Sequence, residues 1–363
     1  YDSASEKVVI AYKDAGNSNY GTALVGTVSG TGISFGSEVV FASSITLAIE
    51  TTFDSASNKV VISYTNQSNS NYGTAIVGTV SGTSISFGTA VVFESAQAFM
   101  KTITFDSTAN KVVISYRDMG NSNYGTAIVG TVSGTGISFG SPVVYNSAGA
   151  ESNSSTFDSN SNKVVIAYRD EGNSDYGTAI VGTVSGTGIS FGSEVVFESN
   201  SSDSLRTVFD ASNNTVVIGY TTGSKGYVIA GTVSGTDISF ATRLLFVNNG
   251  FNGWAIVYNS TEEKSVISYR NNANNYGISI VYTGAYDATN LTAENYIGMA
   301  NGAAADGGTA RVQIGSGINT AQSSLTAGQQ YFVQTDGTLG LTAADPSVIA
   351  GTAISATDII VKG

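Results

Sequence analysis

One phrase of seventeen residues, YGTAIVGTVSGTGISFG, recurs along the chain with small edits and constrains the fold more than any other feature. It begins at Tyr20, Tyr72, Tyr124 and Tyr176, and returns more loosely at Tyr227. An aromatic residue followed by Asp or Asn recurs with it, at positions 1, 53, 105, 157, 209 and 258, a period of 52 residues that shortens to 49 at the last step. A fixed period of this length indicates an array of one structural unit.

Each repeat reads as four short strands joined by tight turns. In the second copy, residues 48–53 (AIETTF), 59–64 (KVVISY), 72–80 (YGTAIVGTV) and 84–93 (SISFGTAVVF) have strand patterns, and we expect a bulge at Gly88 in the last of them. Polar turns such as DSASN and SGT separate the strands. Four antiparallel strands per repeat predict the blade of a β-propeller, with a stacked solenoid as the alternative.

The sequence therefore predicts an all-β chain with two domains. Residues 1–285 are expected to form a propeller of six four-stranded blades, and residues 286–363, where the repeated phrase is absent, a small C-terminal β domain. The predicted blades are residues 1–47, 48–99, 100–151, 152–203, 204–252 and 253–285. Both terminal copies lack a strand, and the chain starts at Tyr1 rather than Met, so we expect a fragment or a processed product.

Charge and composition exclude several functions. The net charge of −12 argues against nucleic acid and against an anionic membrane surface as partners. The chain has no Cys, so it has no disulfide framework, and no His, so it lacks the commonest zinc ligand and general base. It contains neither an apolar stretch long enough for a membrane-spanning helix nor a visible signal peptide.

The segments after the fourth strands vary while the rest of the repeat stays nearly constant. They read ASSITLAIE, ESAQAFMK, NSAGAESNS, ESNSSDSLR and VNNGFNGW. Relaxed constraint in tolerant loops is one interpretation. The other is a binding face, because exposed aromatic and Met side chains are costly on a surface and useful in recognition. The candidate ligand-binding residues in these segments are Glu50, Phe99, Met100, Lys101, Glu151, Arg206, Phe251 and Trp254.

The loops after the second strands are expected on the same face and are rich in Asp and Asn. Asp170, Asn173 and Asp175, in the segment DEGNSD, form a weak calcium candidate, since hard cations prefer several oxygen ligands. The segment lacks the alternating Asp pattern and terminal Glu of an EF-hand, and an Asx-type turn is the alternative. No other metal or cofactor is predicted.

An enzyme is not predicted. Arg117, Arg169 and Arg270 occupy equivalent positions, as an acidic-sugar hydrolase would need, but the S-x-D-x-G-x-T-W boxes typical of sialidases are missing from every repeat. The acidic residues Glu50 and Glu151 have no partner that the sequence can place. Glycosidases need a pair of carboxyl groups at defined separation. No catalytic residue is therefore assigned.

Long segments of the chain resemble tail-fibre and virion structural proteins of marine tailed bacteriophages. The resemblance rests on the repeat FDSNSNKVVIAYRDEGNSDYGTAIVGTVSGTGISFGSEVVF and on LTAENYIGMANG, GQQYFVQTDGTLGLT and VIAGTAISATDIIVKG near the C-terminus. It implies a virion tail-fibre or other extracellular location, and it carries no catalytic residues. The part that attaches such a fibre to the virion is not found in this sequence, so attachment is inferred only.

Together with the variable segments, this resemblance implies a non-enzymatic adhesin that recognises a bacterial surface glycan. Aromatic rings stack on sugar faces, and Asn, Asp and Ser bind hydroxyl groups. The expected partners are that glycan and other virion subunits, in a homo-oligomer for which a trimer is one option, because several weak sites then give avidity. The alternative is a purely structural virion or appendage component whose variable segments make subunit contacts.

Overall fold

The computed structural model describes residues 1–248, 250–282, 299–300, 312–313, 317–334, 339–343 and 347–362. The chain divides into two compact units, Tyr1–Ala285 and Tyr286–Gly363. The described secondary structure consists of antiparallel β-strands and two short 3-10 helices, so the fold is all-β as predicted. None of the described helices has the length and apolar character needed to cross a membrane.

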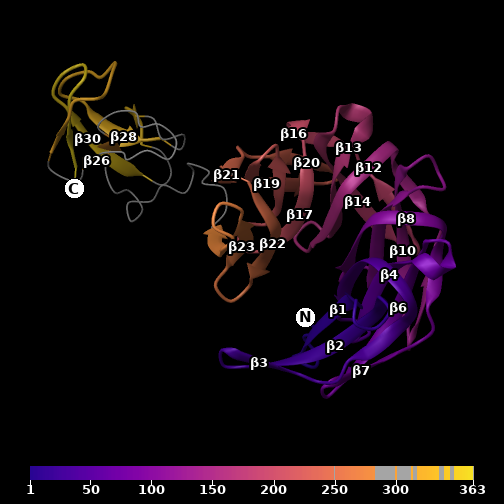
Figure 1. The fold of residues 1–363 in the computed structure, drawn as a ribbon. Coiled ribbons are helices and arrows are strands. Elements are labelled where there is room, and N and C mark those ends of the chain that lie inside the picture. The colour runs from indigo at the N-terminus through magenta and orange to yellow at the C-terminus, as the bar shows by residue number, and fades with distance from the viewer. Residues whose placement is uncertain are drawn as a thin grey trace. The chain divides into compact units, whose positions relative to one another are not determined.

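The first unit contains six repeat sheets, which follow one another from the indigo to the orange end of the ribbon (Figure 1). Repeat sheet 1 contains β1 (Val8–Asp14), β2 (Tyr20–Ser29), β3 (Gly32–Phe35) and the first part of β4 (Val39–Asp54). Repeat sheet 2 contains the rest of β4, β5 (Lys59–Asn66), β6 (Tyr72–Ser81), β7 (Ser84–Phe87) and the first part of β8 (Val91–Asp106), with η1 (Gln67–Asn69) after β5. Repeat sheet 3 contains the rest of β8, β9 (Lys111–Asp118), β10 (Tyr124–Ser133), β11 (Gly136–Phe139) and the first part of β12 (Val143–Asp158).

The remaining sheets continue the pattern. Repeat sheet 4 contains the rest of β12, β13 (Lys163–Asp170), η2 (Glu171–Asn173), β14 (Tyr176–Ser185), β15 (Gly188–Phe191) and β16 (Val195–Ser201). Repeat sheet 5 contains β17 (Asp203–Asp210), β18 (Thr215–Thr222), β19 (Lys225–Ser234), β20 (Asp237–Phe240) and β21 (Leu244–Val247). Repeat sheet 6 contains β22 (Phe251–Asn259), β23 (Lys264–Asn271) and β24 (Gly277–Tyr282).

The second unit has shorter strands. They are β25 (Met299–Ala300), β26 (Val312–Gln313), β27 (Ile318–Asn319), β28 (Gln330–Val333), β29 (Leu339–Gly340), β30 (Val348–Ala353) and β31 (Ile359–Val361). Tyr331, Val333, Val348 and Ile359 belong to its hydrophobic core. Two segments of this unit read as short strands from their sequence, 295–302 (NYIGMANG) and 308–317 (GTARVQIGSG), and parts of both lie outside the described residues.

Successive repeat sheets pack through one recurring interface. The Tyr of the second strand, for example Tyr116, is fully buried and meets the aromatic of the preceding sheet's fourth strand, Phe93, with ring centroids 5.4 Å apart. The same pairing joins Phe41 to Tyr64 and Phe197 to Tyr220. These second strands are buried on both faces, which explains why KVVISY reads as a continuous apolar run.

The turns use the residues that local geometry requires. The carboxylate of Asp54 accepts hydrogen bonds from the backbone N–H groups of Ala56 and Ser57, at 2.9 and 3.0 Å. Asp106, Asp158 and Asp210 do the same in later repeats. In the SGT turn, Gly82 has φ of 61°, a conformation in which a side chain is strained. The turns predicted from Asp, Asn and Gly are therefore confirmed.

The fourth strand is broken at Gly88, as predicted, but not by a bulge. β7 and the start of β8 are separate strands, and both pair with β6. They separate at Gly88, where a Cβ atom would lie 1.9 Å from the carbonyl oxygen of Thr135. The variable segments are also not loops in the first repeats, because β4, β8 and β12 run without interruption from one sheet into the next. Pairing at both ends keeps their backbone groups hydrogen-bonded.

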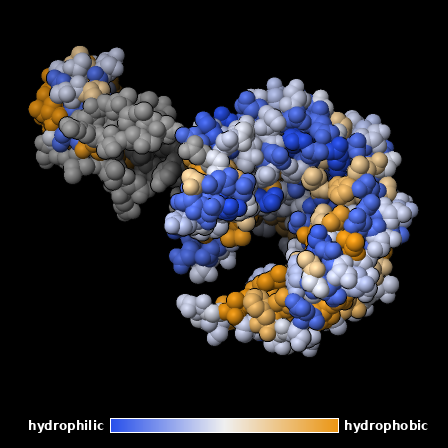
Figure 2. Space-filling view, in the orientation of Figure 1, coloured by the Kyte–Doolittle hydropathy of each residue, from blue (hydrophilic) through white to orange (hydrophobic). Residues whose placement is uncertain are grey.

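The two terminal sheets each leave an apolar face exposed. In repeat sheet 1, Val28, Ile33 and Phe35 are 56%, 45% and 51% exposed, whereas Ile85, the equivalent of Ile33 in the next sheet, is 3% exposed. These residues form the orange surface over β2 and β3 (Figure 2). Val257 and Val281 of repeat sheet 6 are also more than half exposed. No strand pairing in the described part of the chain joins these two sheets.

The glycine of the YG dipeptide gives a stability prediction. A Cβ atom at Gly73 would lie 2.6 Å from the buried ring of Phe93, so Gly73→Val should lower the free energy of unfolding by roughly 1–3 kcal/mol. The equivalent Gly277 has no atom of the described residues within 4 Å of its Cβ position, so Gly277→Val should change it by less than about 0.5 kcal/mol. Urea titrations of both variants test this. Equal losses of stability in the two variants would contradict the packing described.

Candidate functional site

The first strands of successive repeat sheets bring the variable segments together. β4, β8, β12, β17 and β22 lie side by side in this order. Between β8 and β12 the hydroxyl groups of Thr102 and Ser155 are 3.0 Å apart, and between β12 and β17 those of Ser154 and Thr207 are also 3.0 Å apart. Segments that are far apart in the sequence therefore share one location.

A bulge at the same position interrupts each of these strands. The pairing register shifts there, and the bulged residue has positive φ: 45° at Ala48, 48° at Met100, 52° at Ser152 and 52° at Ser204. Only the last copy places a glycine there, Gly253. A non-glycine residue in this region is strained, and backbone strain of this kind clusters at functional sites. Bulges also redirect the side chains that follow them.

A pocket of about 530 Å³ lies at these bulges, within the roughly 300–1,000 Å³ range of small-molecule sites. Its charged lining residues are Glu50, Lys101, Asp203 and Arg206. The other lining residues are Leu47, Ala48, Phe99, Met100, Ser152, Asn153 and Ser204. All of them come from the variable segments of four successive strands, β4, β8, β12 and β17.

Lys101 is a buried cation, only 4% exposed. Its equivalents in repeat sheets 2 and 5 are the apolar Ile49 and Leu205, and its equivalent in repeat sheet 4 is the polar Asn153. Its Nζ donates to Thr65 Oγ1 at 2.6 Å and to the carbonyl oxygen of Ala98 at 3.5 Å. Burial lowers the pKa of Lys101 from 10.5 to about 7, and the nearby Glu50 carboxylate partly opposes this shift. Lys101 therefore changes charge near neutral pH.

Glu50 is the acidic counterpart in the pocket. The pocket walls desolvate its carboxylate and raise the pKa of Glu50, although the side chain keeps contact with solvent, while Arg206 and Lys101 act in the opposite direction. Within the described residues, its carboxylate makes no hydrogen bond or ion pair. Its acceptor oxygens therefore stay available to a ligand.

Asn153 adds an amide whose hydrogen-bonding groups are not satisfied. It is 8% exposed, and neither its Oδ1 nor its Nδ2 has a well-aligned partner among the described residues. Burial raises the pKa of Tyr145, and the interaction of its hydroxyl with the Asn153 side chain acts to lower that pKa, but no well-aligned hydrogen bond joins the two groups. A buried polar group without a partner is costly, so a ligand that binds this amide would recover that energy.

The guanidinium of Arg206 is positioned by Leu205 and Trp254. Its Nη1 donates to the carbonyl oxygen of Leu205 at 2.7 Å, and its guanidinium carbon lies 6.0 Å from the centroid of the Trp254 ring. The side chain is exposed, so its remaining N–H groups face solvent. Arg206 can therefore donate to a ligand in the pocket.

Glu151 lies beside the pocket but does not line it. Its carboxylate pairs with both Arg117 and Arg169, and Arg117 also lies 3.1 Å from Glu171. Arg169 reaches Asp203 at 3.7 Å. These ion pairs occupy Arg117 and Arg169, two of the three arginines that an acidic-sugar site would have needed, which favours a structural role for them.

Two of the predicted site residues are in the core. Trp254 and Phe251 are 7% and 9% exposed and pack with Phe246 between repeat sheets 5 and 6. The expectation that these rings are exposed was wrong. The pocket brings together Glu50, Phe99, Met100, Lys101 and Arg206, of which Phe99 is half-buried and Met100 is 45% exposed.

The calcium candidate forms a turn. Asp170 Oδ1 accepts from the backbone N–H of Gly172 at 2.9 Å and caps η2, and Asp175 Oδ1 lies 3.5 Å from Arg169 Nε. The described residues contain no cluster of three or more His, Asp or Glu side chains suited to a metal ion. Calcium coordination at Asp170, Asn173 and Asp175 stays a prediction.

Four residues that line the pocket were not predicted from the sequence: Ser152, Asn153, Asp203 and Ser204. Each is a polar residue in a chain that is rich in polar residues, so its type alone does not indicate a binding site. The column that contains Ile49, Lys101, Asn153 and Leu205 does carry one, because two polar residues replace apolar ones there. Comparing the copies column by column would have identified Asn153.

No known protein family matches the sequence, and no curated protein matches it. Several solved structures are similar. They include AofleA from Arthrobotrys oligospora, with 8% identity, a TM-score of 0.47 and coverage of 78% of this chain and 84% of that chain. The major Malassezia sympodialis allergen Mala s 1 has 14% identity, a TM-score of 0.47 and coverage of 77% and 90%. The SapL1 lectin, solved in complex with alpha methyl fucoside, has 13% identity, a TM-score of 0.42 and coverage of 77% and 93%. Because these TM-scores lie below 0.5, we draw no functional conclusion from them.

Proposed function

We propose that this chain is a non-enzymatic saccharide-binding protein and that the pocket at the bulges is its binding site. The observation that carries the proposal is the convergence of Glu50, Lys101, Asn153 and Arg206 from four successive strands on one pocket, beside the apolar side chains of Phe99 and Met100. A carboxylate accepts hydrogen bonds, a guanidinium donates them, and an amide does both. Such a mixture suits the hydroxyl groups of a sugar, while an aromatic ring suits its C–H face.

The packing of the repeat sheets around the pocket supports a β-propeller as the fold of the first unit. Five equivalent interfaces join the six repeat sheets, and the terminal sheets expose the two faces that pack together in those interfaces. Closure of repeat sheet 1 on repeat sheet 6 would bury Ile33, Phe35, Val257 and Val281. The first strands would then surround a central axis, with the pocket at one end of it.

The biological role that we propose is that of an adhesin in a phage tail fibre, which recognises a bacterial surface polysaccharide outside the cell. The support is the resemblance of the repeats to tail-fibre proteins and the variation among the segments that line the pocket. A homo-oligomer, of which a trimer is one form, would multiply a weak single site.

A structural component of a virion or appendage is the second candidate. The exposed apolar residues Val28, Ile33 and Phe35 of repeat sheet 1 favour it, because a surface of this kind marks a contact with another polypeptide (Figure 2). In that case the chain would bind its neighbours and no glycan.

Binding to an array of bacterial surface glycans tests the proposal. The native chain is expected to bind at least one glycan, and Glu50→Gln and Arg206→Ala should each weaken that binding roughly tenfold or more, because each removes a charged hydrogen-bonding group. Glu262→Gln and Lys225→Ala change an acidic and a basic residue at exposed positions outside the pocket and should have no effect. Folded protein that binds no glycan would favour the structural candidate.

A further inference from the structure

In each of repeat sheets 1 to 5, one glycine is covered by an aromatic ring from the fourth strand. Cβ atoms at Gly21, Gly73, Gly125, Gly177 and Gly226 would lie 2.5 or 2.6 Å from a ring atom of Phe41, Phe93, Tyr145, Phe197 and Phe246, respectively. In repeat sheet 2, Val91 pairs with Ala75 and Val92 with Thr74, and the register then shifts so that Phe93 lies over Gly73. The absence of a side chain at this glycine is therefore what admits the ring.

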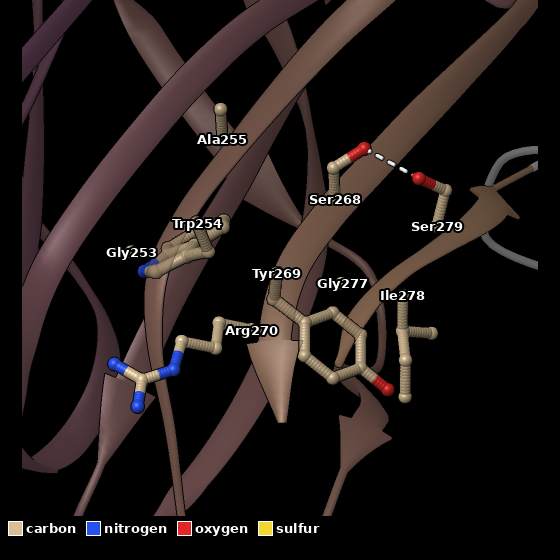
Figure 3. A pocket seen from close by; sticks show the side chains of 9 residues that line it. All are labelled: Gly253, Trp254, Ala255, Ser268, Tyr269, Arg270, Gly277, Ile278 and Ser279. Atoms are coloured by element: carbon tan, nitrogen blue, oxygen red, sulfur yellow. Dashed lines mark hydrogen bonds between the residues drawn. The ribbon is translucent and has the colours of Figure 1, made fainter. Parts of the chain in front are cut away.

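Repeat sheet 6 has the glycine but not the ring. No atom of the described residues lies within 4 Å of a Cβ atom built at Gly277, and in the described part of the chain β24 pairs only with β23. A pocket of about 390 Å³ is found here, and its lining includes Gly253, Ala255, Ser268, Gly277 and Ser279 (Figure 3). The Ser268 and Ser279 hydroxyl groups are 2.8 Å apart at this pocket (Figure 3).

We propose that this edge of repeat sheet 6 is a binding site for one extended strand of a partner polypeptide, which carries two aliphatic residues followed by an aromatic residue. The strand would pair with β24, and its aromatic ring would occupy the pocket over Gly277. Backbone hydrogen bonds to the edge of β24 that is unpaired among the described residues would supply affinity in this mode of recognition, and a side-chain pocket would supply specificity.

The chain's own fourth strands define the register of the bound strand. Its aliphatic residues would lie opposite Ser279 and Ile278, as Val91 and Val92 lie opposite Ala75 and Thr74. The residue after the ring would lie opposite Gly277, which itself pairs with Arg270. In repeat sheets 2 and 4 the residue after the ring, opposite the glycine, is Glu94 and Glu198. We therefore expect Arg270, which lies beside Gly277, to favour an acidic residue at this position of the bound strand.

A peptide with the sequence of residues 193–201, SEVVFESNS, is the probe. We expect saturable binding of the fluorescent peptide to the purified full chain, measured by anisotropy. Replacing its Phe with Ala should weaken binding at least tenfold, because the buried ring supplies much of the apolar contact.

Gly277→Val is the matched protein variant. The valine side chain meets no atom of the described residues in the free chain, so the unfolding midpoint should stay unchanged. The same side chain would fill the space that the peptide's aromatic ring needs, so peptide binding should fall at least tenfold. Gly32→Ser, which copies Ser84 of the next repeat, is the control and should bind normally. No saturable binding, or equal binding by the Gly277→Val variant, would overturn the proposal. This test uses no glycan, so its result is independent of the saccharide proposal.

Discussion

Raising the pH from 7 to 9 is expected to increase the free energy of unfolding of the first unit by about 2 kcal/mol. Lys101 has a pKa of about 7 in the folded chain and 10.5 as its ordinary value. Between these two values the unfolded chain holds a proton that the folded chain has released, so stability rises with pH. Below pH 7 both states are protonated, and the full cost of burying the charged ammonium remains.

The measurement is a series of urea titrations at pH 7, 8 and 9, followed by the fluorescence of the single Trp, which lies in the first unit. Lys101→Met removes the titrating group and should make stability nearly independent of pH over this range. Lys225→Met changes an exposed lysine and should keep the native slope. A native chain whose stability is flat or falls from pH 7 to 9 would show that Lys101 is not buried as described.

Trp254→Ala is expected to lower the free energy of unfolding by about 3–5 kcal/mol, since it empties a large volume from the core. The ring packs between repeat sheets 5 and 6, with centroids 5.7 Å from Phe246 and 6.3 Å from Phe251. Its edge also contacts Gly219, where a Cβ atom would lie 2.5 Å from the indole. No smaller side chain fills this space.

Denaturant titration monitored by circular dichroism tests this prediction. Tyr276→Ala is the matched control, because Tyr276 is an aromatic residue of the same sheet region that is 69% exposed, and it should change stability by less than about 0.5 kcal/mol. A small effect of Trp254→Ala, combined with a loss of glycan binding, would instead return Trp254 to the surface role that its position in a variable segment first predicted.

The repeat made much of the strand pattern predictable. Strands β5 and β6 begin at Lys59 and Tyr72, as their apolar patterns predict. The tight turn after Asp54 fixes where β5 begins, and the turn at Gly82 fixes where β6 ends. The bulges were not predictable from one copy. Ala48, Met100 and Ser152 have no residue type in common, and only their shared positive φ identifies the position. The variable segments inside β4, β8 and β12 are polar, so their sequence predicts loops. In the structure each of these strands is paired at both ends.

The candidate site was predicted in part for a similar reason. Lys101, Glu50 and Arg206 were predicted as site residues because charged residues make up only 12% of the chain. Phe251 and Trp254 were predicted as site residues because they are aromatic residues in a variable segment. The alternation of faces along β22 instead places their side chains in the core. Burial at this position depends on how the bulge shifts the alternation, which a sequence pattern alone does not specify.

The most direct test of the central claim is NMR of the chain with ¹³C-labelled methionine methyl groups during titration with a glycan that it binds. The chain has 3 methionines. Met100 lines the pocket, Met119 is 44% exposed outside it, and Met299 lies in the second unit. A saccharide in the pocket should shift the Met100 signal in a saturable way and leave the other two in place. Saturable shifts of Met119 or Met299 with Met100 unchanged would place the glycan elsewhere and contradict the proposed site.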